Sequence, residues 1–298
     1  MKNRPKFFII TLMVVFLLIA FSSNTFAGYF SNDEYKKMVK EAIKQEKSLK
    51  TTKGALAVLY FNNQSGRADY NSLQKGLALM LFDDFQKIKR KNFQVVDRGK
   101  LQALIDELKL STSGLVKPET APRVGKLLGA ETILYGDLLS DKKAELKVNP
   151  EMLNVMKKKS LEQKDVDGQL KELIRIEKDI LKNSLNSLKI VPTKEEKKLL
   201  DIPLSEKVSA LDPLFKAVDA TDRENWKEAE PLYIKSFTED PNLLKTITEL
   251  VKDIAPTVLS VAAGVMFIKK LHDMKKDKGK KKSPGMSLPT GFSKPKFP

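Results

Sequence analysis

Residues 54–141 constrain the fold most, because strand and helix patterns alternate there without interruption. The apolar run 55–61 leads into the turn-forming segment Asn62–Gly66, which predicts a buried strand ending in a turn. Apolar side chains then recur at helical spacing and predict a helix of about five turns. These are Leu73, Leu77, Leu81, Phe85 and Ile88. We expect this helix to lie on a sheet.

The same alternation continues towards Asp141. A second strand is expected at 93–97, a helix at 101–108, and a break at Ser111–Gly114. A third helix should begin at Pro118 and end at Gly129, before a third strand at 131–136. This order predicts an α/β fold with an open sheet and packed helices.

Five short motifs in this region carry a family resemblance. They are Ala-Val-Leu-Tyr-Phe-Asn at 57–62, Lys-Gly-Leu-Ala at 75–78, Val-Val-Asp-Arg at 95–98, Leu-Ser-Thr-Ser-Gly-Leu-Val at 110–116 and Gly-Lys-Leu-Leu-Gly-Ala at 125–130. In this order they resemble the curli production assembly/transport family (CsgG-like). The resemblance covers residues 54–168 and continues more weakly to Asn242.

The resemblance implies two further strands, at 146–155 and 158–167, and a helix at 168–188 that packs back on the domain. Pro150 and the lysines at 157–159 argue against a membrane-spanning hairpin here. The membrane channel of this family usually begins with a lipidated cysteine, whereas this sequence contains no cysteine. The missing cysteines also exclude disulfides, thiolate metal sites and a cysteine nucleophile.

The first residues have the pattern of a secretory signal peptide. Three basic residues precede an apolar run of about 15 residues, and small residues before Gly28 fit a cleavage site. We therefore expect residues 1–27 to be removed and the protein to be periplasmic, with an association with the outer membrane left open. An uncleaved membrane anchor is the alternative, although the run is short for a bilayer span.

Changes in composition, together with proline and glycine positions, divide the chain after residue 27 into segments. We expect an N-terminal helix and linker at 28–53, the CsgG-like domain at 54–190, and a tetratricopeptide-like helical region at 191–242. An apolar helix at 243–274 and a basic disordered tail at 275–298 follow. The N-terminal helix could pack on the core or on a neighbouring subunit.

Residues 225–242 resemble the second helix of a tetratricopeptide repeat. Ala229, Tyr233 and Pro241 have the expected spacing, whereas Ser236 replaces a small alanine and Pro231 should kink the helix. A single helical pair cannot bury its own apolar face, so it should dock on the core or on a partner. Trp226 and Tyr233 are the partner-binding candidates of this segment.

The C-terminal part is apolar and then strongly basic. The uncharged run 254–268 is short for a membrane span, which leaves a packed helix, an interfacial helix or a span open. Lysines after it are candidates for contact with anionic lipid or an acidic partner, against the alternative of a solvated tail. The lysines are Lys275, Lys276, Lys280, Lys281 and Lys282.

The sequence offers little for catalysis. It lacks a phosphate-binding loop, a nucleophile elbow and a zinc-protease motif, so we expect no catalytic residues, no metal and no cofactor. Asp83 and Asp84 are adjacent on a helix and diverge in direction. Asp97 and Arg98 could form a local ion pair at a strand end, and Asn62 and Asn63 should hold the turn.

These observations favour a non-enzymatic component of curli-type secretion or outer-envelope assembly that acts by oligomerisation and protein contacts. A soluble periplasmic adaptor that binds a client through its helical region is the alternative, and an enzyme or small-ligand sensor using the sheet crevice is a third hypothesis. Expected partners are proteins of the cell envelope, with homo-oligomerisation and membrane-surface contact through 254–282 left open. Much of the net charge of +16 lies in the signal segment and the tail, which argues against nucleic acid as a partner.

Overall fold

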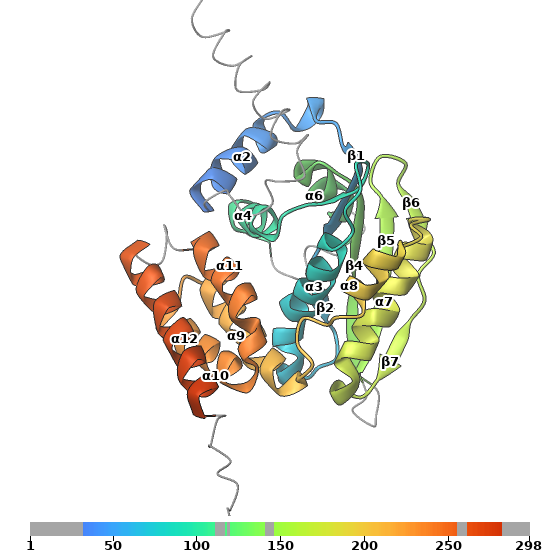
Figure 1. Cartoon of the computed structure of the whole chain (residues 1–298). Helices are drawn as coiled ribbons and strands as arrows, with labels where there is room; N and C mark the ends of the chain where they lie inside the picture. Colours follow the sequence, from blue (N-terminus) through green and yellow to red (C-terminus); the bar gives the residue numbers. More distant parts are fainter. Residues whose placement is uncertain (1–31, 111–116, 118–119, 141–145, 255–260, 282–298) are drawn as a thin grey trace, which may run out of the picture.

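The structure is a computed structural model that describes residues 32–110, 117, 120–140, 146–254 and 261–281 (Figure 1). The predicted signal peptide, the break at 111–114, Pro118 and Lys282 lie outside these residues.

Seven strands of the described residues form one open, mixed sheet. Five of them follow the order β3-β1-β4-β5-β6, while β2 pairs with β4 and β7 pairs with β5. Their bounds are β1 Thr52–Val58, β2 Asn62–Asn63, β3 Gln94–Val95, β4 Ala130–Ser140, β5 Leu146–Asn154, β6 Lys159–Leu161 and β7 Val166–Gly168. β1 runs parallel to both β3 and β4, and the short β2 also pairs in parallel with β4. β5 is antiparallel to β4, β6 and β7. The predicted open α/β sheet is therefore confirmed.

The strand order requires helices on both faces of the sheet. The α-helices of the α/β part are α2 Asn32–Lys44, α3 Asn71–Gln86, α4 Arg98–Leu108, α6 Ala121–Leu128 and α7 Leu173–Ser187, with short 3₁₀ turns η1 Glu46–Ser48, η2 Ala68–Tyr70 and η3 Leu170–Glu172. The chain passes through α3 from β1 to β3 on one side, and through α4 and α6 from β3 to β4 on the other side of β1. Because such crossovers are right-handed, α3 and α4/α6 lie on opposite faces.

Local residue chemistry sets several of these boundaries. The Asp97 side chain accepts a hydrogen bond from the Gly99 backbone N–H at 2.7 Å and caps α4. Gly129 ends α6 in the left-handed conformation, with φ of 75°, which suits a residue without Cβ. α6 begins at Ala121, and Pro122 lies in its first turn, where a proline's missing N–H costs nothing.

Several predicted boundaries differ in detail. The predicted turn at 62–66 begins with β2, because Asn62 and Asn63 pair with the long β4. The predicted strand 158–167 is two short strands, β6 and β7, which pair with opposite ends of β5. Gly168 ends β7, and the long helix begins only after η3.

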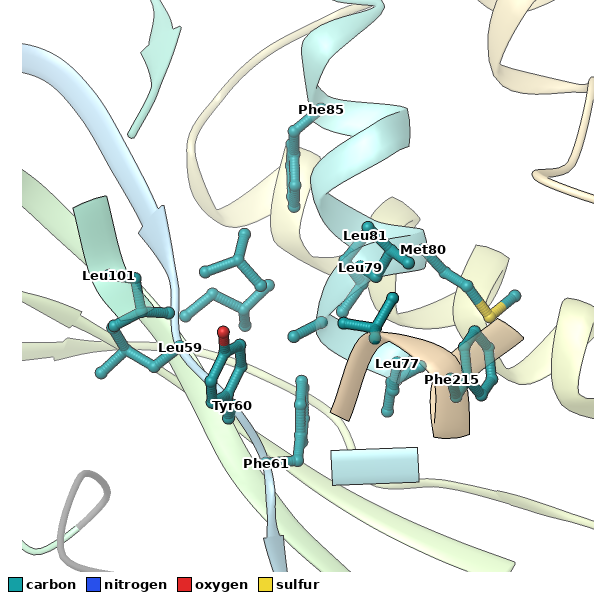
Figure 2. Packing of buried hydrophobic residues seen from close by; sticks show 14 of the residues in the cluster. Leu59, Tyr60, Phe61, Leu77, Leu79, Met80, Leu81, Phe85, Leu101 and Phe215 are labelled. Atoms are coloured by element: carbon teal, nitrogen blue, oxygen red, sulfur yellow. The ribbon is translucent and has the colours of Figure 1, made fainter. Parts of the chain in front are cut away.

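The core lies between the sheet and its helices. Leu59 and Phe61 after β1 are completely buried, as are Leu81 and Phe85 of α3. Figure 2 shows Phe61 extending from the strand end towards α3, Leu59 beside Leu101 of α4, and Phe215 from the C-terminal helices beside Leu77 and Met80. The predicted apolar face of α3 is thus confirmed. Another side of α3 is also buried, because Phe215 of the C-terminal helices packs against it.

The C-terminal region is all helical. It comprises α8 Lys194–Leu200, α9 Val208–Asp222, α10 Trp226–Glu239, the 3₁₀ turn η4 Pro241–Leu243, α11 Leu244–Ile254 and α12 Val261–Lys281. The predicted cap of α8 is confirmed, since Thr193 and Glu196 bond reciprocally to each other's backbone N–H groups. α10 packs along α9 and continues through Pro231, while α9 contacts α3 of the α/β part. The tetratricopeptide-like character of the C-terminal region and the domain boundaries remain predictions.

The predicted single helix 243–274 is wrong. The described residues form two helices there, α11 and α12, which contact each other. α12 also continues to Lys281, so the first residues of the predicted disordered tail are helical. In the described part of the chain, no helix combines the length and the apolar character needed to cross a membrane.

The N-terminal helix α2 packs on its own core. Tyr35 and Val39 are buried, and α2 contacts α4 and α6. Lys40 of α2 lies 3.7 Å from Glu107 of α4. This position corresponds to the first of the two alternatives, packing on the core.

A test of the core compares two helical leucines. Leu81→Ala should lower the free energy of unfolding by roughly 2–5 kcal/mol, because Leu81 is completely buried between α3 and the sheet. Leu199→Ala on α8 is the matched control, since Leu199 is 46% exposed, and its effect should stay within about 0.5 kcal/mol. Urea unfolding followed by circular dichroism measures both. Equal, small effects would contradict the placement of α3.

Candidate functional site

The candidate site lies where the order of the sheet reverses. β1 and β3 are neighbours, but their following helices, α3 and α4, go to opposite faces. In open α/β sheets, ligands bind in the crevice at the carboxyl ends of such strands. Tyr60 follows β1 and Arg98 follows β3, so both lie at this point of the fold.

A dense group of charges fills this crevice. The Arg98 guanidinium donates to both carboxylate oxygens of Asp222 at 3.0 Å and to the Tyr60 hydroxyl at 3.1 Å. The Lys75 ammonium lies 3.0 Å from Asp222 and 2.9 Å from Asp219. We call these five residues the switch-point cluster. Only 3% of the Asp222 side chain and 10% of the Arg98 side chain are exposed.

The cluster perturbs the titration of its own members. Burial raises the pKa of Tyr60 to about 12, and the Asp222 carboxylate adds to this effect. Burial is the largest single influence on Lys75 and Arg98 and acts to lower their pKa values, but the Asp222 carboxylate together with neighbouring groups such as Tyr60 outweighs it, so both pKa values are raised. For Asp219, burial opposes a larger combined effect of Lys75 and Arg223, so its pKa is lowered. Lys75, Arg98 and Asp219 are therefore charged at neutral pH.

Apolar packing beside the cluster also holds α9, the helix that carries Asp219 and Asp222. Phe215 is buried on α9, one turn before Asp219 and two turns before Asp222, so all three share one face. Its ring covers Gly76 of α3 so closely that a Cβ on Gly76 would lie 2.2 Å from a ring carbon. Gly76 is thus required by the close approach of α9.

The crevice is occupied by the protein's own helix. Asp222 provides a carboxylate to Arg98 and Lys75, the cations that would otherwise recognise an anionic ligand, while the Tyr60 hydroxyl accepts from Arg98 and donates to Gln102. The predicted local ion pair of Asp97 with Arg98 is wrong, because Arg98 turns to α9 while Asp97 caps α4. The sequence contained Lys75 and Arg98 as motif residues, but gave no signal that Asp222, far along the chain, would meet them.

The asparagines after β1 have structural roles. Asn63 accepts hydrogen bonds from the backbone and hydroxyl of Ser65 and donates to the Arg67 carbonyl oxygen. Asn62 donates to Asp137 of β4 at 2.9 Å. Asn63 therefore holds the turn, as expected, whereas Asn62 connects β2 to β4.

The two aromatic partner-binding candidates lie mainly inside the helical region. Tyr233 is completely buried and its hydroxyl is 3.1 Å from that of Thr221. This position contradicts a role for Tyr233 as an exposed contact. Trp226 is half-buried, with its ring edge-on to Phe267 of α12 at 5.1 Å between centroids. Both rings hold α10 and α12 together.

The basic candidates are distributed along and beyond α12. Lys275 and Lys276 are exposed on this helix, and Lys280 and Lys281 form its end. Lys282 lies outside the described residues. The partner-binding role of these lysines remains a prediction.

A second buried charge group connects α3 and α7. Asp84 and Glu177 are each 1% exposed, and Asp84 accepts from Lys178 and from Lys87, the latter at 2.5 Å. Burial and the neighbouring Asp84 raise the pKa of Glu177 well above its usual value. Asp84 thus pairs with a residue of another helix and not with its neighbour Asp83. Helical periodicity marks Glu177 only as a polar position, so the proximity of Glu177 to Asp84 could not be predicted from the sequence.

Metal-binding side chains do not gather in the described part of the chain, where no group of three or more histidine, aspartate and glutamate residues could hold an ion. The switch-point cluster is consequently the best-defined polar site of the described residues. It can bind a carboxylate through two cations, and it does so with Asp222.

The two cations of the switch-point cluster, Lys75 and Arg98, lie in a region that matches a protein-family model. Residues 36–140 match the family model of the curli production assembly/transport component CsgG. This CsgG-matched region runs from α2 to the end of β4 and contains Lys75, Gly76 and Arg98. Asp222 and α9 lie outside it. A comparison with curated proteins finds no match.

Several solved structures have limited similarity to the chain. The LpoB C-terminal domain from Salmonella enterica is 16% identical, with 45% of this chain and 94% of that chain covered, and a TM-score of 0.29. The corresponding domain from Escherichia coli is 16% identical, with 46% and 98% covered and a TM-score of 0.29. Lipoprotein GNA1162 from Neisseria meningitidis is 11% identical, with 39% and 80% covered and a TM-score of 0.32. At these scores the likeness supports no statement about shared function.

The contact of Gly76 with Phe215 predicts that alanine at position 76 lowers the free energy of unfolding, the opposite of its usual effect in a helix. Replacing a helical glycine by alanine ordinarily stabilises a protein by roughly 0.5–1 kcal/mol. Gly76→Ala should instead destabilise by roughly 1–3 kcal/mol, because its methyl group collides with the Phe215 ring. In a Phe215→Ala background the same change should be stabilising. Urea unfolding of the four proteins measures this, and a stabilising Gly76→Ala in the wild-type background would contradict the docking of α9.

The raised pKa of Glu177 predicts a dependence on pH. A carboxyl group whose folded pKa exceeds its unfolded value gives its full stabilisation below the unfolded pKa, about 4.3, and loses it as pH rises through the folded pKa. Glu177→Gln stays neutral, so it should raise the melting temperature at pH 7 and change it much less at pH 4. Glu206→Gln, at an exposed position, is the control. An equal effect of Glu177→Gln at both pH values would contradict the assignment.

Proposed function

We propose that this protein is a non-enzymatic, CsgG-like component of curli-type secretion or outer-envelope assembly that acts through self-association and protein contacts. The observation that carries the proposal is the match of residues 36–140 to the CsgG family model. The proposed place of action is the periplasm, with protein partners of the cell envelope.

The geometry of the crevice supports a role in protein contacts over chemistry. The groups that could bind a small anion are held by Asp222 and Asp219 of the same chain. The described acidic and basic side chains of this site form ion pairs between two parts of the fold, and their charges compensate each other. This arrangement suits a rigid scaffold that presents its outer surfaces to other proteins.

A soluble periplasmic adaptor is the second candidate function. The observation that favours it is the helical region α9 to α12, which lies entirely outside the CsgG-matched region. α9 anchors this region on α3, while exposed side chains of α10 and α12 remain available for a client. In this alternative the CsgG-matched region supports the helices and does not form a ring.

The two functions differ in the predicted mass of the protein in solution. Size exclusion with light scattering of the exported protein, extracted with detergent, should give one discrete assembly of several subunits for the secretion or assembly component. The mass should stay constant over a tenfold dilution, because a specific ring has a defined stoichiometry. A monomer at all concentrations would contradict the primary proposal and favour the adaptor.

A further inference from the structure

Two carboxyl groups and one ammonium group meet where α7 packs against α3 (Figure 1). Asp84 of α3 and Glu177 of α7 are each 1% exposed. The Lys178 ammonium donates to one carboxylate oxygen of Asp84 and lies 3.6 Å from Oε2 of Glu177. The other carboxylate oxygen of Asp84 accepts from Lys87, which also lies 2.9 Å from Asp83. We call these five residues the α3–α7 charge group.

The α3–α7 charge group contains three carboxyl groups and only two ammonium groups. If all five were ionised, one negative charge would remain without a partner. Two of the three carboxyl groups are almost completely buried, and an unpaired charge in such a position is costly. One bound proton removes this charge, so the group is balanced only when it holds a proton.

The hydrogen bonds indicate that Glu177 holds this proton. Both oxygens of Asp84 accept hydrogen bonds from lysine side chains. In contrast, Oε1 of Glu177 is buried and has no hydrogen-bond donor among the described residues. A buried carboxylate oxygen without a donor is unfavourable. In agreement, burial and the negative charge of Asp84 raise the pKa of Glu177 well above its usual value.

Glu177 also interrupts an apolar stripe. Leu173 and Leu181 lie one turn before and one turn after it, and both are buried, as are Ile176 and Ile180. An apolar side chain between them would favour the attachment of α7 at every pH. A carboxyl group at this position makes the attachment depend on pH.

The other elements that pack on α7 contribute charged groups of a different kind. Asp167 of β7 and Lys171 of η3 are exposed. Glu172 of η3 pairs with the exposed Arg175 at 3.4 Å. Such solvated groups respond weakly to the attachment of the helix, so Glu177 should dominate its pH dependence.

We propose that the Asp84–Glu177 pair is a proton-dependent latch between α3 and α7, closed while Glu177 is protonated and loosened when Glu177 ionises. The latch includes the turn after α8, because Lys87 donates to the Ile202 carbonyl oxygen at 2.8 Å. The Arg98–Asp222 pair that holds α9 belongs to a different group. The inference goes beyond the proposed function and applies equally to an assembly component and to an adaptor.

The latch predicts that local opening of α7 releases one proton. The folded pKa of Glu177 lies above its unfolded value of about 4.3. The stabilisation is therefore complete below the unfolded pKa and is lost as pH rises through the folded pKa. Between these two pKa values the opening constant of α7 should rise about tenfold per pH unit.

The test places one thiol in the full chain, whose sequence contains no cysteine. Ser184→Cys puts it at a completely buried position of α7, and Ser236→Cys of α10 is the matched control, since Ser236 is also completely buried. The rate of reaction with a thiol reagent, divided by the rate for the same variant unfolded in urea, gives the opening constant at each pH. Between pH 5 and pH 8 this constant should rise steeply for Ser184→Cys and much less for Ser236→Cys.

A second substitution shows which group titrates. Glu177→Gln in the Ser184→Cys protein should abolish the rise with pH, whereas Glu206→Gln, at an exposed position, should leave it unchanged. A pH-independent opening constant at position 184, or a rise that persists with Glu177→Gln, would overturn the proposal. An equal rise at positions 184 and 236 would mean global opening and would overturn a latch confined to α7.

A direct titration covers the case in which Ser184→Cys does not fold. The carboxyl ¹³C resonance of Glu177 in the wild-type protein, assigned by its loss in Glu177→Gln, should titrate at a higher pH than those of exposed glutamates. A midpoint in the ordinary glutamate range would contradict the latch.

Discussion

The buried ion pair between Arg98 and Asp222 is the interaction on which the arrangement of the two parts depends. Removing two charges from water is costly, and the cost is offset only when the pair is well aligned and has further partners. Here Arg98 contacts both carboxylate oxygens, and Lys75 and Tyr60 complete the surroundings of the two groups. Leaving either charge buried without its partner would be strongly destabilising. α9 is therefore held at the crevice by a constraint that generic apolar packing does not supply.

This constraint links the motif residues to the helical region. Lys75 and Gly76 belong to the Lys-Gly-Leu-Ala motif, and Arg98 ends the Val-Val-Asp-Arg motif, yet all three contact α9 outside the CsgG-matched region. Phe215 on Gly76 sets the distance between α3 and α9, and the charges set the position of α9 along α3. Because α10 packs on α9, and Phe267 of α12 packs on Trp226 and Tyr233, the orientation of the outer helices follows from the same contact. The exposed lysines of α12 thus have a fixed position relative to the sheet.

Much of the α/β part could be predicted from the sequence, because its signals are local. The apolar spacing of α3, the Thr193 cap and the glycine at the end of α6 each depend on neighbouring residues. The predictions were wrong for segments whose structure depends on contacts with residues far along the chain. β6 and β7 are separate because they pair with opposite ends of β5, and α12 is a second helix that contacts α11 and packs on Trp226 of α10. For the candidate site, the sequence pattern places Arg98 at a strand end, but its partner lies 124 residues further along the chain. Tyr233 has the spacing of a tetratricopeptide helix, but that spacing does not reveal that its ring is completely buried.

A double-mutant cycle between Arg98 and Asp222 tests the central claim most directly. The free energies of unfolding of the wild type, Arg98→Met, Asp222→Leu and the double variant would be measured with urea. If the two side chains form a buried pair, each single variant leaves a charge without its main partner, and the double variant removes both charges. The account then predicts that the double variant is less destabilised than the sum of the singles, by about 1.5–3 kcal/mol. Additive effects, within about 0.5 kcal/mol, would contradict the contact and the docking of α9 in the crevice.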